Sequence, residues 1–222
     1  MTSSPSQVRI AKIPHLPFPV ATRLFAIAAA CAVLAWGPID AGAQETPSAA
    51  EFAAISSHLP PLDREDGVVD IPLATPGEQG GFAPIRDGVE ISTRAPLSVG
   101  YRLRPGTPAG VARVLPAGAL AGLETITLRG RADRNVRLTV TLQDGQGAVF
   151  SLGSVTLGAG PAREHVLSLG DAAYFAPQST APDPGTFKAQ DAVLLTLLDI
   201  AGFTTDATPE VAWTIERLEG AE

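Results

Sequence analysis

The stretch LETITLRGRADRNVRLTVTLQDGQGAVFSL, residues 123–152, decides the fold class. Apolar and polar residues alternate along it in two runs, and a Gly-rich turn at 143–147 leads into a third. Successive side chains of a strand point to opposite faces, so this alternation predicts a β-meander with one face in a core. The predicted core face holds Ile126, Leu128, Val136, Leu138, Val140 and Leu142, and the other face holds Thr127, Arg129, Arg137, Thr139 and Thr141.

Short strand patterns continue on both sides of this stretch. They are separated by Pro- and Gly-rich connections and cover residues 67–73, 88–92, 97–104, 155–157, 164–169, 192–200 and 211–218. The segment 192–200 is apolar on both faces, which is typical of a central strand. Many short strands with little helix predict an all-β domain, a two-sheet antiparallel β-sandwich with jelly-roll topology.

The first 43 residues have the pattern of a secretory signal peptide. Basic residues Arg9, Lys12 and Arg23 precede an apolar run from Leu24 to Trp36, and small residues ending at Ala43 suit cleavage before residue 44. The run is too short for a comfortable membrane span. We therefore expect a cleaved signal helix, no stable membrane span after cleavage, and a periplasmic or extracellular location. A retained signal anchor is the alternative.

The rest of the chain divides into two parts. In residues 44–61, Ser48 could cap a short helix that Pro60 and Pro61 would stop, and a mobile N-terminal arm is the alternative. No shift of composition marks a boundary after residue 62, so 62–222 is interpreted as one β-sandwich domain.

Charge and cysteine content restrict the classes of partner. The chain has a formal net charge of −7 and its one cysteine, Cys31, lies inside the leader. An acidic chain is a poor partner for nucleic acid. An exported domain without cysteine must rely on an ordinary hydrophobic core instead of disulfides.

Three aromatic residues lie beside or within the longest irregular stretch, residues 174–191. They are Tyr174, Phe175 and Phe187, and such long loops are often functional. Aromatic rings can stack on the apolar faces of sugar rings, so these three are candidate ligand-binding residues. They could equally pin the loop to the sandwich. Trp213 alternates with Val211 and Ile215 and is expected in the core.

Arginines are concentrated at the end of the predicted hairpin. Arg129, Arg131 and Arg137 are candidate binding residues, because guanidinium groups bind carboxylate and sulfate groups through paired hydrogen bonds. They would suit an anionic glycan. The alternative is that charge keeps an edge and a turn soluble.

No catalytic residues are predicted. His58 and His165 lack sequence partners, and Ser154 lies outside any Gly-x-Ser-x-Gly pattern, so it is expected to be a strand residue.

The order of features from about Leu115 to Glu219 resembles the galactose-binding-like jelly roll of carbohydrate-binding modules and of the complex I intermediate-associated protein family. The segment Leu120-Ala-Gly-Leu-Glu-Thr-Ile-Thr-Leu128 resembles the lead-in, Gln143-Asp-Gly-Gln-Gly147 the turn, Val149-Phe150 the next strand and Ile215-Glu-Arg-Leu218 the closing strand. Family members often have two acids in that closing strand, and some hold calcium there. Arg217 replaces the second acid, so we expect no cofactor, and Glu216 is left as the residue that could ligate a structural calcium ion.

Together these features predict an exported, non-catalytic binding module, and the resemblance implies a saccharide or polysaccharide as its ligand. Two alternatives stay open. One is a structural or protein-binding component of the cell envelope, and the other is a polysaccharide-active enzyme, which would need a pair of acids or a metal cluster in one cleft.

Overall fold

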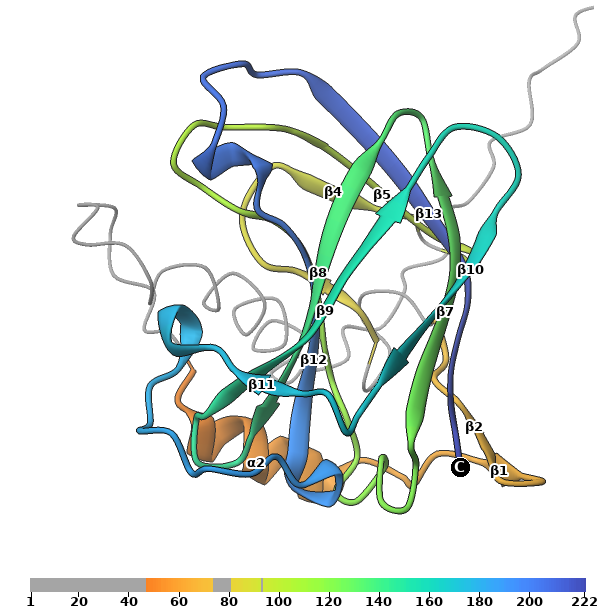
Figure 1. Ribbon diagram of the computed structural model, residues 1–222, viewed down its shortest axis with the longest axis vertical. Coiled ribbons are helices and arrows are strands. Elements are labelled where there is room, and N and C mark those ends of the chain that lie inside the picture. Colours follow the sequence, from red (N-terminus) through yellow and green to blue (C-terminus); the bar gives the residue numbers. More distant parts are fainter. Residues whose placement is uncertain (1–46, 74–80, 93) are drawn as a thin grey trace, which may run out of the picture.

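The computed structural model describes residues 47–73, 81–92 and 94–222, and these form two antiparallel β-sheets packed face to face with one helix against them (Figure 1). The predicted β-sandwich of jelly-roll type is therefore confirmed. The signal peptide and cleavage site that the sequence predicts, together with Cys31, lie outside the described residues.

Sheet A has seven strands, in which the long strand β13 (Glu210–Ala221) occupies the centre. On one side β13 pairs with β5 and β2, and on the other side with β7, which in turn pairs with β10. The other strands are β1 (Arg64–Glu65), β2 (Val68–Asp70), β4 (Val89–Ile91), β5 (Leu97–Arg102), β7 (Thr125–Ala132) and β10 (Arg163–Ser168).

Sheet B has six strands in the order β11-β9-β8-β12-β6-β3. Its central strand β12 (Ala192–Asp199) is buried along its whole length, as its doubly apolar sequence predicts. The other strands are β3 (Ala83–Pro84), β6 (Ala109–Val114), β8 (Val136–Asp144), β9 (Val149–Leu157) and β11 (Ala173–Tyr174). Short 3₁₀ turns η1 (Ala176–Gln178), η2 (Ala189–Asp191) and η3 (Ala201–Phe203) lie in the loops.

The meander expectation is wrong for its first strand. β8 and β9 form the expected hairpin, but β7 belongs to sheet A, so the turn at 133–135 crosses from one sheet to the other. The expected inward residues are still correct: Ile126, Leu128, Leu138, Val140 and Leu142 are fully buried. The alternation of apolar residues requires only that one face of each strand lies in a core. Strands in two facing sheets meet this requirement as well as strands in one sheet do.

Strand β6 has no counterpart among the predicted strands. Its sequence, Ala109-Gly-Val-Ala-Arg-Val114, is buried on both faces and therefore lacks alternation. Arg113 shares the parity of Val111 and Leu115, points to the sandwich interior, and donates a hydrogen bond from Nη1 to the carbonyl of Pro72. Burial lowers the pKa of Arg113 to about 10, although the charge of Asp70 opposes this shift.

The helix α2 (Ala49–His58) forms in the N-terminal segment for which helix and arm were both open. Ser48 and Glu51 make a reciprocal capping box at its start. Phe52 inserts into a second apolar cluster, separate from the main core, that contains Ile85, Ala112, Val114, Val193, Leu194 and Leu198. The helix thus covers the lower part of the outer face of sheet B (Figure 1).

Candidate functional site

Arg129 and Arg131 lie side by side on the outer face of sheet A. Both project from β7, and Nε of Arg129 lies 3.3 Å from Oε2 of Glu216, while Nε of Arg131 lies 4.0 Å from its Oε1. A β-bulge between Ile215 and Arg217 resets the alternation of β13. As a result Glu216 and Arg217 are both exposed, and Glu216 faces the two arginines.

Arg217 extends this pairing and was not among the residues singled out from the sequence. Its Nη2 lies 3.3 Å from Oε2 of Glu164 and 3.2 Å from Oε1 of Glu219. We call the set Arg129, Arg131, Arg217, Glu164, Glu216 and Glu219 the ion-pair face. Exposed pairs of this kind contribute little stability. Each arginine already has a carboxylate partner, which competes with an external anion, and two arginines compete with calcium for Glu216.

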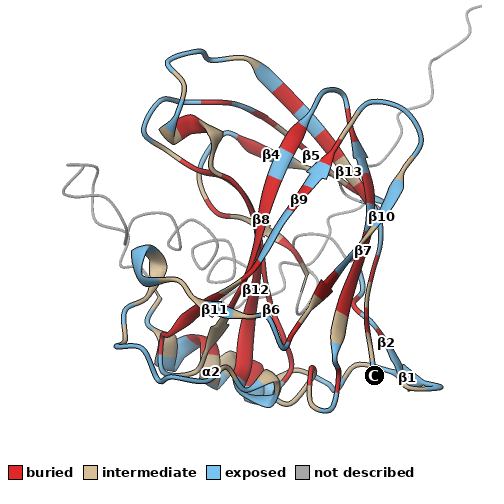
Figure 2. Ribbon diagram, in the orientation of Figure 1, coloured by how far each residue is buried: buried red, intermediate tan, exposed pale blue. Residues whose placement is uncertain are grey.

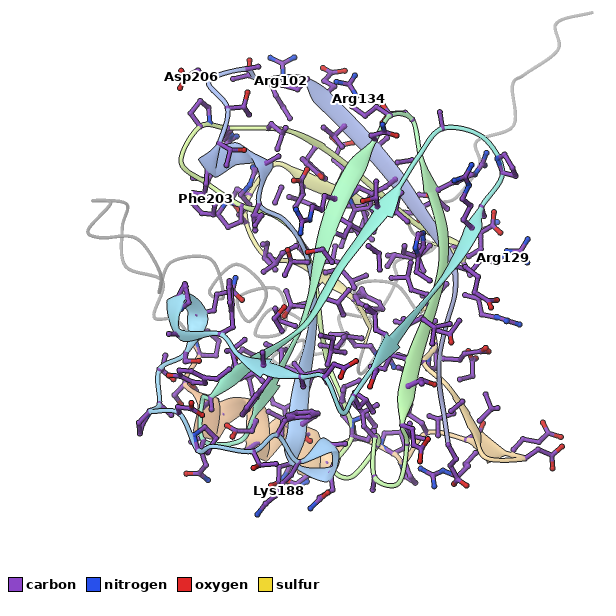
Figure 3. All side chains as sticks on the ribbon, viewed as in Figure 1. Arg102, Arg129, Arg134, Lys188, Phe203 and Asp206 are labelled. Atoms are coloured by element: carbon purple, nitrogen blue, oxygen red, sulfur yellow. The ribbon has the colours of Figure 1, made fainter. Side chains whose placement is uncertain are left out.

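Arg137 does not join this group. It lies on β8 in sheet B, on the opposite outer side of the sandwich, and its cross-strand neighbour is Thr156. Figure 3 shows Arg134 at the turn between β7 and β8, with Arg129 well away on the side of β7. The three candidate arginines are therefore divided between two faces.

The aromatic residues Tyr174 and Phe187 pack on Phe150. The ring centroids of Phe150 and Phe187 are 5.0 Å apart, and those of Phe150 and Tyr174 are 6.2 Å apart in an edge-on arrangement. The Tyr174 hydroxyl donates to the carbonyl of Ala181 at 2.7 Å. These contacts hold the long loop against the sandwich, which is the second of the two roles considered for them.

Phe175 has a different position. Its backbone N–H donates to the carbonyl of Val149 at 2.7 Å, which continues the pairing of β11 with β9 by one residue. Since Tyr174 points inward, alternation places Phe175 on the outer face of sheet B, where it is half-buried. It is the one of the three aromatic candidates that this pairing places on a sheet surface.

The outer face of sheet B carries a group of hydroxyl side chains that we call the hydroxyl patch. Register places them on adjacent strands: Ser151 is opposite Thr141, Ser154 is opposite Thr139, and Thr141 is opposite Thr196. The patch consists of Thr139, Thr141, Ser151, Ser154, Thr156 and Thr196, and Arg137 adjoins it beside Thr156.

Exposure varies across the hydroxyl patch. Ser154 and Thr156 are exposed and Ser151 is half-buried, whereas Thr139, Thr141 and Thr196 are buried. Figure 2 shows exposed positions along the upper parts of β8 and β9. The hydroxyls of Thr139 and Ser154 are 3.3 Å apart and hydrogen-bonded. A bulge in β9 at Leu152 and Gly153, where Gly153 has a φ of 110°, turns both residues inward and so keeps Ser151 and Ser154 both on the outer face.

Three polar side chains, separate from the hydroxyl patch, are buried between the two sheets. The Tyr101 hydroxyl donates to Oδ2 of buried Asp199 at 2.7 Å and accepts from Nε1 of Trp213 at 3.3 Å. Desolvation, followed by the charge of Asp199, raises the pKa of Tyr101, so this phenol stays protonated. These hydrogen bonds link sheet A to sheet B, so the role of the three side chains is structural. The core placement expected for Trp213 is confirmed.

The remaining polar residues considered from the sequence lie apart from one another. His58 is exposed at the end of α2, His165 is half-buried on β10, and Ser154 is a strand residue as expected. Within the ranges that the structure describes, no three His, Cys, Asp or Glu side chains gather as a metal site requires. No helix in that part of the chain is long and apolar enough to span a membrane.

Comparisons with known proteins identify the fold. No family model and no curated protein sequence matches the chain. Similar solved structures include an agarase, with 14% identity and a TM-score of 0.50 over 71% of this chain and 25% of the agarase. A family 11 carbohydrate-binding module of a cellulosomal cellulase of Clostridium thermocellum has 11% identity and a TM-score of 0.45 over 65% of this chain and 84% of the module. A family 29 carbohydrate-binding module has 10% identity and a TM-score of 0.46 over 69% and 90%.

At such identities the similarity is one of fold. The described residues share their two-sheet β-sandwich fold with part of the agarase, in agreement with the jelly-roll fold expected from the sequence. The chain matches about a quarter of the length of the agarase, 25%. The chemistry of a site must therefore be argued from the residues of this chain.

Proposed function

We propose that this chain is an exported, non-catalytic saccharide-binding module whose binding surface is the hydroxyl patch on the outer face of sheet B. The carbohydrate-binding modules named above motivate the ligand class, and the leader pattern of residues 1–43 motivates export. The proposal itself rests on one observation, which is the cross-strand array of Ser and Thr hydroxyls, with Arg137 opposite Thr156 at one end and Phe175 opposite Val149 at the other.

The chemistry of this array suits a sugar. A hydroxyl group both donates and accepts hydrogen bonds, so Ser151, Ser154 and Thr156 can match the hydroxyls of a saccharide in either sense. Phe175, half-buried at the Ser151 end of the patch, can contact the apolar face of a further unit of a longer saccharide. The ion-pair face of sheet A offers less, because its charged groups are already paired with one another.

The first test removes two hydroxyls without disturbing the strand. The double substitution Ser154→Val and Thr156→Val places valine, which favours strands, at both positions of β9. It deletes two hydroxyl groups whose hydrogen bonds are worth about 1 kcal/mol each. We expect saccharide affinity, measured by glycan array and then by titration calorimetry, to fall about thirtyfold. Thr214→Val is the matched control, because Thr214 carries a half-buried hydroxyl, hydrogen-bonded to Ser98, on the outer face of sheet A.

Acidic saccharides provide a further comparison in the same assay. Arg137→Ser should weaken binding of an acidic saccharide, whereas Arg129→Ser should leave it unchanged, because the two residues lie on opposite faces. Unchanged affinity in the Ser154/Thr156 variant, or a parent that binds no saccharide, would contradict the proposed function. If Arg129→Ser weakened binding of the acidic saccharide more than Arg137→Ser does, the binding site would lie on sheet A instead.

A further inference from the structure

The helix α2 shares a sheet face with the hydroxyl patch. On β12, Leu194 and Leu198 belong to the apolar cluster that includes Phe52 of α2, and Thr196 of the hydroxyl patch lies between them with the same parity. On β6, Ala112 of that cluster is directly opposite Thr196. The apolar surface beneath α2 and the hydroxyl patch are therefore parts of one continuous surface.

The attachment of α2 to this surface rests on a few side chains and one backbone hydrogen bond. Phe52 and Ser56 are its buried residues, and Ala53 and Ile55 pack half-buried against the same cluster. The Ser56 hydroxyl is buried without a hydrogen-bond partner among the described residues. One backbone bond, from the N–H of Ala117 to the carbonyl of Ser56 at 3.2 Å, ties its end to the domain. A helix of 10 residues is marginal by itself in water.

Departure of α2 would leave the main core intact. Phe52 packs in a separate cluster, while the core between the sheets is formed by other residues, among them Leu138, Leu197 and Trp213. Elements with few buried contacts open at a lower free energy than the whole domain. The helix can therefore leave the sheet as a local event.

We infer that α2 is a strap across the binding face, which undocks from sheet B when a saccharide occupies the whole face. This inference rests on the proposed function for the identity of the ligand. With α2 docked, a ligand reaches Ser154, Thr156 and Arg137; with α2 undocked, the apolar surface around Ala112 and Leu194 is added. Docking of α2 then competes with binding and lowers the apparent affinity.

The structure provides a way to lock the strap. A Cβ atom placed on Gly145, in the turn between β8 and β9, lies 3.3 Å from Cβ of Ala53 on α2. This is close to the spacing of roughly 3.5–4.5 Å found in disulfides. Ala53→Cys with Gly145→Cys, made in the full chain with Cys31→Ser, gives a reversible lock.

The lock tests the competition directly. We expect the oxidised double variant to bind saccharide about tenfold more weakly than its reduced form, and Phe52→Ala to bind more tightly than the parent. The single variant Ala53→Cys controls for the substitution and for the reductant. Equal affinity of the oxidised and reduced forms would overturn the inference, even where the parent binds saccharide well.

Undocking is also measurable without any ligand, which separates this inference from the proposed function. Val114→Cys places a thiol in the cluster beneath α2, and Val140→Cys places one in the main core, both in the Cys31→Ser chain. Under native conditions we expect a thiol reagent to label V114C about tenfold or more faster than V140C. Equal labelling rates would show that α2 leaves only on global unfolding. If V114C is labelled faster but the parent binds no saccharide, the undocking of α2 would be supported and the saccharide would be rejected as its ligand.

Discussion

Tyr101 connects residues from both sheets through a single hydroxyl group. It receives a hydrogen bond from Trp213 on β13 and gives one to Asp199 at the end of β12. The other carboxylate oxygen of Asp199 accepts the backbone N–H of Ala201 at 2.8 Å. A buried carboxylate is costly unless it is hydrogen-bonded, so the three side chains depend on one another.

Replacement of Tyr101 by Phe should therefore destabilise the domain. The change keeps the ring and leaves Oδ2 of Asp199 and Nε1 of Trp213 without this partner, at a cost of about 1–3 kcal/mol in the free energy of unfolding. Urea denaturation followed by tryptophan fluorescence measures it. Tyr174→Phe is the control, because its hydroxyl serves a half-buried loop, and it should cost less. Equal stability of Y101F and the parent would refute the role of the hydroxyl.

The alternation of apolar and polar residues predicted which side chains point inward. It did not predict which of these side chains contact one another. The inward position of Trp213 follows from its alternation with Val211 and Ile215, whereas its hydroxyl partner, Tyr101, lies on another strand. Arg129 and Arg137 both follow the outward parity, yet the turn at 133–135 changes sheets between them. Hairpin turns and sheet crossings share the same turn residues, so local pattern could not distinguish the two.

Among the described elements, α2 is the one that we expect to undock most independently of the sandwich. Its cap, Ser48 with Glu51, is readable from the sequence, and the spacing of Phe52, Ile55 and Leu59 indicates its apolar side. Its docking surface was not predictable, because that surface is built from β6 and β12, and β6 has no alternating pattern to reveal it.

Phe52→Ala and Leu138→Ala should differ in their effects. Both remove a buried apolar side chain, and core truncations of this size typically cost about 2–5 kcal/mol. The loss at Phe52 is limited by the free energy of docking α2, because the helix can undock while the sandwich persists. We expect the smaller loss of global stability for F52A, measured by urea denaturation. Equal losses would mean that α2 and the sandwich unfold as one unit.

The molecule as a whole has two outer faces of different chemistry. Sheet A presents the ion-pair face, in which arginine and glutamate side chains pair with one another. Sheet B presents hydroxyl groups beside an apolar surface that α2 covers. The fold class and the candidate residues Arg137 and Phe175 were available from the sequence. Their common face was not, because it depends on the pairing of β11, β9, β8 and β12 across long separations in the chain.

The most direct test of the saccharide site is to map the bound ligand on the folded chain. Amide chemical shifts of the ¹⁵N-labelled protein, titrated with the best saccharide from the array, report each strand separately. Our account predicts that shifts concentrate on β8 and β9, around residues 137–141 and 151–156, and extend to Phe175 at the Ser151 end of the patch. Shifts concentrated on β7, β10 and β13 around Arg129 and Glu216, or no shifts on either sheet, would contradict it.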